Sequence, residues 1–175
     1  MADMRRLLAV LGSAIFLVIA PGFVAGVVPW WLSGWGFQDS LLGIRAFRFV
    51  GAALIAVGGA GLLDSFARFA LQGVGTPAPV FPTRHLVVTG LYRYVRNPMY
   101  VAVASAILGQ GLLFGSIPVL EYGSIVWFLF HLFVLFYEEP TLKASFGPEY
   151  EAFLREVPRW IPRLRPWRGP SEQIT

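Results

Sequence analysis

The sequence contains no cysteine, few charged residues and only two histidines. The lack of cysteine excludes disulfides, thiolate zinc sites and a cysteine nucleophile. Charged residues make up 14% of the 175 positions, 56% are hydrophobic, and the mean hydropathy is +0.63. A soluble domain of this size would need far more polar surface to cover its core. The composition therefore predicts a single membrane domain over residues 1–175, with lipid contacting most of its surface.

The formal net charge is +4, from 14 Lys and Arg against 10 Asp and Glu. In a membrane protein this excess favours cytoplasmic loops that face anionic lipid. We expect no nucleic-acid partner, because the sequence has no basic face outside the segments next to the apolar runs. We expect no metal site, because His85, His131 and the carboxylates show no ligand spacing. No feature indicates an obligate protein partner.

Four apolar runs predict an all-α integral membrane protein with about four transmembrane helices. The first, Leu7 to Val28, would span about 33 Å as a helix, which is enough for a bilayer core. Arg5 and Arg6 precede it as in a signal peptide, but its length and the absence of a clear cleavage site favour a retained span. The other runs cover residues 47–71, 98–114 and 122–137.

The last two runs form a predicted antiparallel hairpin, since only residues 115–121 separate them. Small residues on the first arm are expected to let the two arms pack closely. They are Ala102, Ser105, Ala106 and Gly109.

An amphipathic helix is predicted from Pro148, followed by a basic, proline-broken tail expected at the lipid headgroups. Apolar residues recur at i, i+3, i+4 and i+7, which is typical of a helix that lies on the membrane surface. These residues are Tyr150, Phe153, Leu154 and Val157.

The distribution of Lys and Arg predicts the orientation. Basic residues occur at the N-terminus, in the 72–97 loop and after residue 139, whereas the 115–121 turn has none. Arg45 and Arg48 in the first connection are the exceptions. We therefore expect a multi-pass protein of the plasma (inner) membrane with both termini cytoplasmic. Near the end of the second run, Asp64 and Arg68 are four apart, which suits either an ion pair at the headgroups or the polar lining of a cavity.

The stretch GLYRYVRNPMY, residues 90–100, precedes the third run. Asn97 is a good N-cap residue and Pro98 suits the first helical position, so capping alone explains the Asn-Pro pair. A helix start also directs backbone N–H groups and the positive end of the helix dipole outward. With Arg93 and Arg96 beside it, this helix start is also suited to an anionic group.

Two adjacent carboxylates, Glu138 and Glu139, follow the fourth run. They repel each other and face the negative end of a helix dipole, so a cationic group should compensate them. That group is either an arginine or lysine of the tail or a cationic ligand, and either carboxylate is a candidate catalytic base. The helix start and the carboxylate pair together suit a zwitterionic cofactor such as S-adenosylmethionine.

Three stretches resemble motifs of the integral-membrane methyltransferases typified by isoprenylcysteine carboxyl methyltransferase and the phospholipid N-methyltransferases. They are RHLVVTGLYRYVRNPMY, EEPTLKASFGPEY and VPRWIP, within residues 84–162. The resemblance implies an S-adenosylmethionine pocket in residues 72–175, roofed by the hairpin and the C-terminal segment. The pocket would open sideways to membrane lipid and to a lipophilic substrate with a carboxyl, amine or hydroxyl group. Cofactor contacts would fall on Arg84, His85, Leu86, Val87, Tyr92, Asn97, Pro98, Met99, Tyr100 and Glu138 or Glu139, with Arg96 beside them.

The sequence departs from this family pattern at two places. Asn97 replaces the usual histidine before the proline, and because asparagine does not titrate it is no general base. The segment before the glutamates, with Leu132 and Val134, lacks an arginine that would hold a prenylcysteine carboxylate. His131 either binds substrate or is a satisfied core histidine. Two alternatives to a methyltransferase stay open, an NADPH-dependent sterol- or enone-type reductase and a non-enzymatic membrane scaffold.

Overall fold

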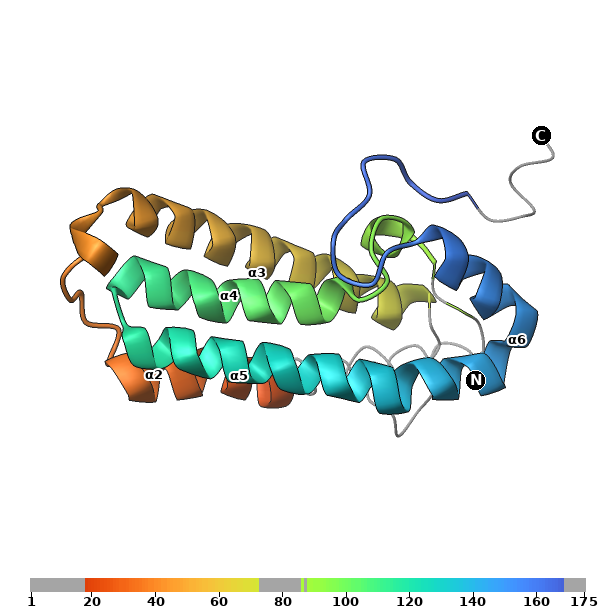
Figure 1. Ribbon diagram of the computed structural model, residues 1–175, viewed down its shortest axis with the longest axis horizontal. Helices are drawn as coiled ribbons and strands as arrows, with labels where there is room; N and C mark the ends of the chain where they lie inside the picture. The colour runs from red at the N-terminus through yellow and green to blue at the C-terminus, as the bar shows by residue number, and fades with distance from the viewer. Residues whose placement is uncertain (1–17, 73–85, 87, 169–175) are drawn as a thin grey trace.

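The computed structural model describes residues 18–72, 86 and 88–168, and every regular element in that part of the chain is helical. The main helices run side by side, and the last helix lies at one end of them together with the loop that returns from it (Figure 1). The elements in chain order are η1 (Phe23–Val27), α2 (Val28–Ser33), η2 (Leu41–Gly43), α3 (Ala46–Gln72), η3 (Gly90–Arg93), α4 (Pro98–Phe114), α5 (Ile117–Phe133), η4 (Val134–Glu138) and α6 (Glu139–Glu156).

Two stretches of helix are long and apolar enough to cross a membrane, Ala46–Arg68 within α3 and Ile117–Glu156 through α5, η4 and α6. Only 11% of the apolar window in α3 is buried within the protein, so this helix is unlike the core helix of a soluble domain. Its exposed apolar side chains need an apolar solvent, and lipid provides one. Helix α4 and residues 18–33 are apolar but shorter. Residues 7–17 of the predicted first span lie outside the described residues.

Helices α3 and α4 pack through glycines that bring their backbones together. A Cβ atom added at Gly58 would lie 2.7 Å from the carbonyl oxygen of Ala102, and one at Gly109 would lie 2.7 Å from that of Gly51. Small residues permit such close approach between membrane helices. The prediction that the small residues of α4 face the other arm of the hairpin was therefore wrong for Ala102 and Gly109, because they face α3.

Replacing Gly58 by alanine should destabilise the protein by about 1–3 kcal/mol, because the new methyl group overlaps the α4 backbone. Its neighbour Gly59 provides a matched control, since a Cβ there meets nothing within 4 Å. Gly59→Ala should be neutral or stabilise the helix by up to about 1 kcal/mol. The midpoints of thermal unfolding in the same detergent compare the two variants. Equal midpoints would contradict the close packing of α3 on α4.

The turn between α4 and α5 is shorter than predicted. Helix α4 ends at Phe114 and is capped by Gly115, which has a φ of +74°, and α5 begins at Ile117 instead of near residue 122. Pro118 is tolerated because it lies in the first helical turn, where no backbone donor is required. The segment GSIPVLEY is therefore mostly helix, and α4 and α5 run antiparallel (Figure 1).

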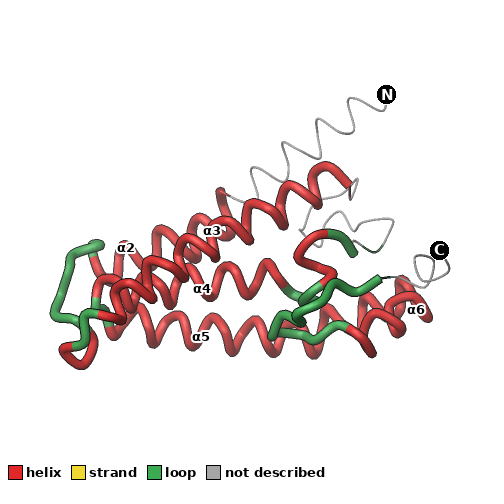
Figure 2. Tube along the Cα trace, turned by 90° about the horizontal axis from the view of Figure 1, so that it is seen from above, coloured by secondary structure: helices red, strands yellow, loops and turns green. Residues whose placement is uncertain are grey.

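Helix α5 does not end at the glutamate pair. It continues through the π-turn η4 into α6, and Pro140 is accommodated in the first turn of α6. The break comes later, at Gly147, whose φ of +50° and ψ of −126° favour glycine. A helical segment restarts at Pro148, as the sequence predicts. Figure 2 shows α6 at the far end of α5 and turned away from it.

The apolar face of this last segment packs on the protein itself. Tyr150, Phe153 and Val157 are buried in a cluster with Trp167, against which Leu86 also packs. The expectation that these side chains lie on the membrane surface was wrong, because the returning tail covers them. Amphipathic periodicity indicates that one face is buried, but it does not specify by what.

Candidate functional site

The glutamate pair lies at the end of the π-turn η4. A π-turn contains one more residue than an α-helical turn, so it rotates the side chains that follow it, and such turns are frequent at functional sites. Neighbouring side chains on a helix point in different directions, and here the two adjacent carboxylates have different partners. Glu138 contacts Tyr100 on α4, whereas Glu139 contacts Arg96 and Arg159.

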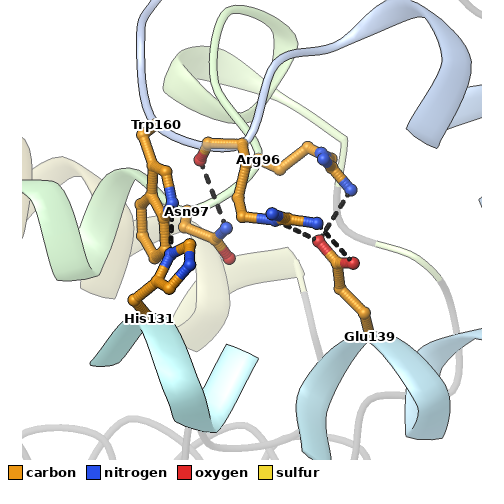
Figure 3. A network of polar contacts seen from close by, with 6 residues as sticks. Arg96, Asn97, His131, Glu139 and Trp160 are labelled. Atoms are coloured by element: carbon orange, nitrogen blue, oxygen red, sulfur yellow. Dashed lines mark hydrogen bonds and ion pairs between the residues drawn. The ribbon is translucent and has the colours of Figure 1, made fainter. Parts of the chain in front are cut away.

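Glu139 is the centre of an ion-pair network. Its Oε1 accepts hydrogen bonds from Arg96 Nη1 at 2.9 Å and Arg159 Nε at 2.7 Å, and its Oε2 accepts one from Arg159 Nη2 at 2.9 Å (Figure 3). The Glu139 side chain is 13% exposed and that of Arg96 is 10% exposed. The predicted compensation by a tail cation is therefore confirmed for Glu139, with Arg159 as the tail residue. These three groups carry one negative and two positive charges.

Glu138 has a different environment. Its Oε2 accepts a hydrogen bond from the Tyr100 hydroxyl at 2.8 Å. Within the described part of the chain no arginine or lysine forms an ion pair with it. The Tyr100 ring packs on Phe130 and Phe133, with ring centroids 4.8 Å and 6.4 Å apart. The Glu138 carboxylate therefore lies beside aromatic rings and a phenol, which suits a cationic ligand.

The start of α4 begins as predicted at Pro98, but Asn97 does not cap it. The side-chain amide of Asn97 instead donates to the carbonyl oxygen of Arg159 at 3.2 Å. The Nε atom of Arg96 is buried and, among the described residues, has no hydrogen-bond partner. The start of α4 therefore keeps the positive end of its dipole without a side-chain cap, and Arg96 precedes it by two residues, which suits an anionic group.

Residues 157–168, the C-terminal strap, fold back over this helix start. The backbone N–H of Arg96 donates to Pro158, that of Arg163 to Tyr94, and that of Trp167 to Arg93. These bonds are 2.8–2.9 Å long. The strap therefore pairs along residues 93–96 and brings Arg159 to Glu139.

His131 contacts the strap. Its Nδ1 accepts a hydrogen bond from Trp160 Nε1 at 3.0 Å, and the indole ring of Trp160 also packs on Trp127 with a centroid distance of 4.5 Å. Figure 3 shows His131 and Trp160 on one side of Asn97, and Glu139 on the other. This geometry favours the satisfied histidine over the substrate ligand, because one ring nitrogen already has a protein partner.

Tyr92 is buried in the turn before α4. Burial raises the pKa of its hydroxyl well above the ordinary value, and the nearby Glu138 carboxylate raises it further. Tyr92 is therefore a neutral phenol at physiological pH and acts as a hydrogen-bonding group, not as a base.

A separate open groove of about 490 Å³ lies between α3 and η3. Asp64 and Arg68 line it and form an ion pair of 2.8 Å, so an ion pair and the polar lining of a groove are both present. Gly90, with a φ of +53°, leaves room for the Arg68 guanidinium. The residues that line this groove do not include Tyr100 or Glu138.

Apart from Tyr92 and His131, the predicted site residues divide into three groups. Arg96, Asn97, Tyr100, Glu138 and Glu139 meet around the start of α4 and the end of η4. Leu86 packs in the α6 cluster, while Pro98 is buried and Met99 half-buried in the first turn of α4. Arg84, His85 and Val87 lie outside the described residues.

Three contributing residues were not predicted as site residues. Arg159 and Trp160 belong to the VPRWIP stretch, whose resemblance to the family was the available signal. Trp127 gave no signal, because one tryptophan in an apolar run is expected in any membrane helix.

Comparison with known proteins places this site within a family. Residues 46–149, more than half of the chain, match the phospholipid methyltransferase family. Over 82 residues the chain is 38% identical to the protein-S-isoprenylcysteine O-methyltransferase of Schizosaccharomyces pombe, covering 46% of this chain and 34% of that protein.

Two bacterial proteins are also similar. The cobalt-zinc-cadmium resistance protein CzcN of Cupriavidus metallidurans is 34% identical over 49% of this chain and 39% of its own length. The nickel-cobalt-cadmium resistance protein NccN of Alcaligenes xylosoxydans xylosoxydans is 32% identical over 51% of this chain and 41% of its own length. The matches thus span well under half of the length of these relatives. The part of the chain that the structure describes has no group of three His, Cys, Asp or Glu placed to hold a metal ion.

Proposed function

Since the chain belongs to the phospholipid methyltransferase family, we propose that it is an S-adenosylmethionine-dependent enzyme that methylates a lipophilic acceptor within the membrane. The observation that supports this most strongly is the division of the glutamate pair. Glu139 is neutralised by two arginines, while Glu138 has only the Tyr100 hydroxyl among its described polar partners. One carboxylate thus holds the fold together and the other is free for a ligand.

The described residues fit the two charged ends of this cofactor. The buried Nε of Arg96 and the uncapped start of α4 are suited to its carboxylate. Glu138 and the aromatic rings around Tyr100 are suited to its ammonium and sulfonium groups. The predicted contacts at Arg84, His85, Leu86, Val87, Tyr92, Pro98 and Met99 remain part of this proposal.

Methyl transfer needs alignment and exclusion of water more than acid or base groups. When bound, S-adenosylmethionine supplies a methyl group on a positively charged sulfur. The strap and α4 cover the site, and Tyr100 orients the Glu138 carboxylate through its hydrogen bond. A carboxylate acceptor needs no base, whereas an amine or hydroxyl acceptor must lose a proton. Glu138 is the better candidate to accept that proton, because the Glu139 oxygens are occupied by arginines.

The acceptor is a carboxyl, amine or hydroxyl group of a lipid or isoprenoid. A membrane domain suits such a substrate, since a soluble one would need no lateral access from lipid. In our proposal the protein spans the inner membrane about four times with both termini cytoplasmic. The site then lies at the cytoplasmic headgroup level, where the basic loops are.

Calorimetry on the detergent-solubilised protein tests the cofactor. We expect binding of S-adenosylhomocysteine and no binding of NADPH under the same conditions, because the charge pattern matches an amino acid and not a 2′-phosphate. Affinity for NADPH without affinity for S-adenosylhomocysteine would indicate the reductase instead. Binding of neither compound would favour the scaffold.

Labelling with isotopic methionine then identifies the acceptor. Cells with and without the protein are grown on methyl-labelled methionine and their lipids are compared by mass spectrometry. We expect at least one labelled lipid to be missing from the deletion strain. Identical labelled lipids in both strains would contradict methylation of a membrane acceptor.

A further inference from the structure

The C-terminal strap, residues 157–168, exposes two large apolar side chains. Leu164 is 98% exposed and Ile161 is 77% exposed. A single exposed leucine is normal on protein surfaces, so exposure alone indicates no partner. Here, however, the two residues lie three positions apart in a segment whose other face is fixed to the protein.

The strap is also strongly basic. It contains four arginines and no acidic residue. Arg159 points inward to Glu139, and the side chain of Arg163 donates to the carbonyl oxygen of Glu156. Arg165 and Arg168 are exposed on either side of Trp167, near the exposed leucine in sequence. Exposed aliphatic side chains among arginines are the pattern of segments that bind anionic membrane surfaces.

The strap lies at the end of the apolar helices, where lipid headgroups are expected. It pairs with residues 93–96, directly before the first residue of the apolar helix α4 (Figure 1). The apolar stretch of α3 ends at Arg68, which also lies close to this turn, because it contacts Gly90. At this end of the bundle the apolar helices therefore give way to charged residues, as at a lipid–water boundary.

The strap is held in place before any lipid binds. Its three backbone hydrogen bonds to residues 93–96 fix its course, and Pro158, Pro162 and Pro166 restrict its backbone. A surface that is already ordered loses little conformational entropy on binding. Its outward side chains are therefore arranged for contact.

We propose that the strap is a binding surface for anionic phospholipid. Ile161 and Leu164 enter the boundary between headgroups and acyl chains, while Arg165 lies against the lipid phosphates. Charge complementarity favours an anionic lipid surface over a protein partner, because the segment has no acidic group to match a mixed protein surface. This proposal goes beyond methyl transfer and does not rest on it.

Spin labelling tests the proposal, and the absence of cysteine makes a single label specific. Leu164→Cys is labelled in the full chain, reconstituted in nanodiscs of phosphatidylcholine with or without about 30% phosphatidylglycerol. The exposed Glu151 on α6 gives the control label as Glu151→Cys. Accessibility to oxygen and to a water-soluble nickel chelate is measured by electron paramagnetic resonance.

We expect the label at residue 164 to be less accessible to nickel than the label at residue 151, at least threefold in discs with phosphatidylglycerol. Phosphatidylglycerol should lower the accessibility of this label to nickel, and adding Arg165→Gln should remove at least half of that decrease. Arg155→Gln, which removes the same charge from an exposed site on α6, should leave it unchanged. A label at residue 164 that is as accessible as the control in both lipids would overturn the proposal. Shielding that appears only when a second protein is added would overturn it in favour of a protein interface.

Discussion

Replacing Glu139 by glutamine should lower the free energy of unfolding by about 3 kcal/mol, the lower end of the cost of breaking a buried ion pair. The reason is that two arginines lose at once the one carboxylate that pairs with them among the described residues. Arg96 is 10% exposed and Arg159 is 28% exposed, so water compensates Arg96 poorly and Arg159 in part. A glutamine keeps one acceptor oxygen, but its amide nitrogen cannot accept from Arg159 Nη2 and the side chain carries no charge. Unfolding of the solubilised protein, followed by circular dichroism, measures the effect.

Two further variants show whether the loss of stability comes from the ion-pair network or from removing any glutamate. Glu149→Gln makes the same chemical change at an exposed position of α6 and should alter stability by less than about 0.5 kcal/mol. Arg159→Gln, alone and combined with Glu139→Gln, completes a double-mutant cycle. Its coupling energy should be about 1–3 kcal/mol, the range of residues in direct contact. Additive effects would contradict the pairing of the strap with α6.

The same variant should loosen the strap. Arg159 holds Glu139 through two hydrogen bonds, and its neighbour Trp160 donates to His131. Loss of the ion pair should therefore raise amide hydrogen exchange at Arg96, Arg163 and Trp167, whose N–H groups bond between strap and turn. Faster exchange confined to these residues separates local opening of the strap from global unfolding. Unchanged exchange at these positions would mean that the backbone bonds alone hold the strap.

The sequence predicted the bounds of a helix correctly wherever a single physical signal determined them. The run predicted at residues 47–71 is α3, and the run at residues 98–114 is α4, because apolar length and the Asn-Pro start leave little choice. The start of α5 was placed too late, since Pro118 and Glu121 were read as a turn when proline is equally suited to a first helical turn.

Apart from the tail cation expected beside the glutamate pair, the sequence did not predict the partners of the site residues, because long-range contacts determine them. Nothing in the run VLFYE indicates a π-turn, or shows that Glu138 and Glu139 have different partners. Asn97 has the sequence signature of a cap, but the Arg159 carbonyl competes for its amide. Periodicity likewise identified the apolar face of residues 148–157 without showing that Trp167 covers it. In each case a segment distant in sequence supplies the partner.

Glu138→Gln should leave the fold intact and weaken binding of S-adenosylmethionine roughly 10- to 100-fold. Hydrogen bonds to charged groups contribute about 1.5–3 kcal/mol, and this carboxylate has no described cation that would substitute for a ligand. Glutamine can still accept the Tyr100 hydroxyl, so the local structure is kept. The dissociation constant from calorimetry and the unfolding midpoint are measured on the same preparation. Binding should fall while the midpoint stays within a few degrees of the parent protein.

Tyr100→Phe should have a smaller effect on cofactor binding than Glu138→Gln. It removes the hydroxyl that orients Glu138 but keeps the ring packed on Phe130. It should weaken binding only about 2- to 10-fold, the value of one neutral hydrogen bond. A role for Glu138 as a base would show differently, as a fall in kcat of at least about 100-fold with an unchanged dissociation constant. If Glu138→Gln bound the cofactor as tightly as the parent and turned over normally, the free carboxylate would have no part in the reaction. The cofactor contact would then have to be sought at residues outside this site, first at Arg84 and His85.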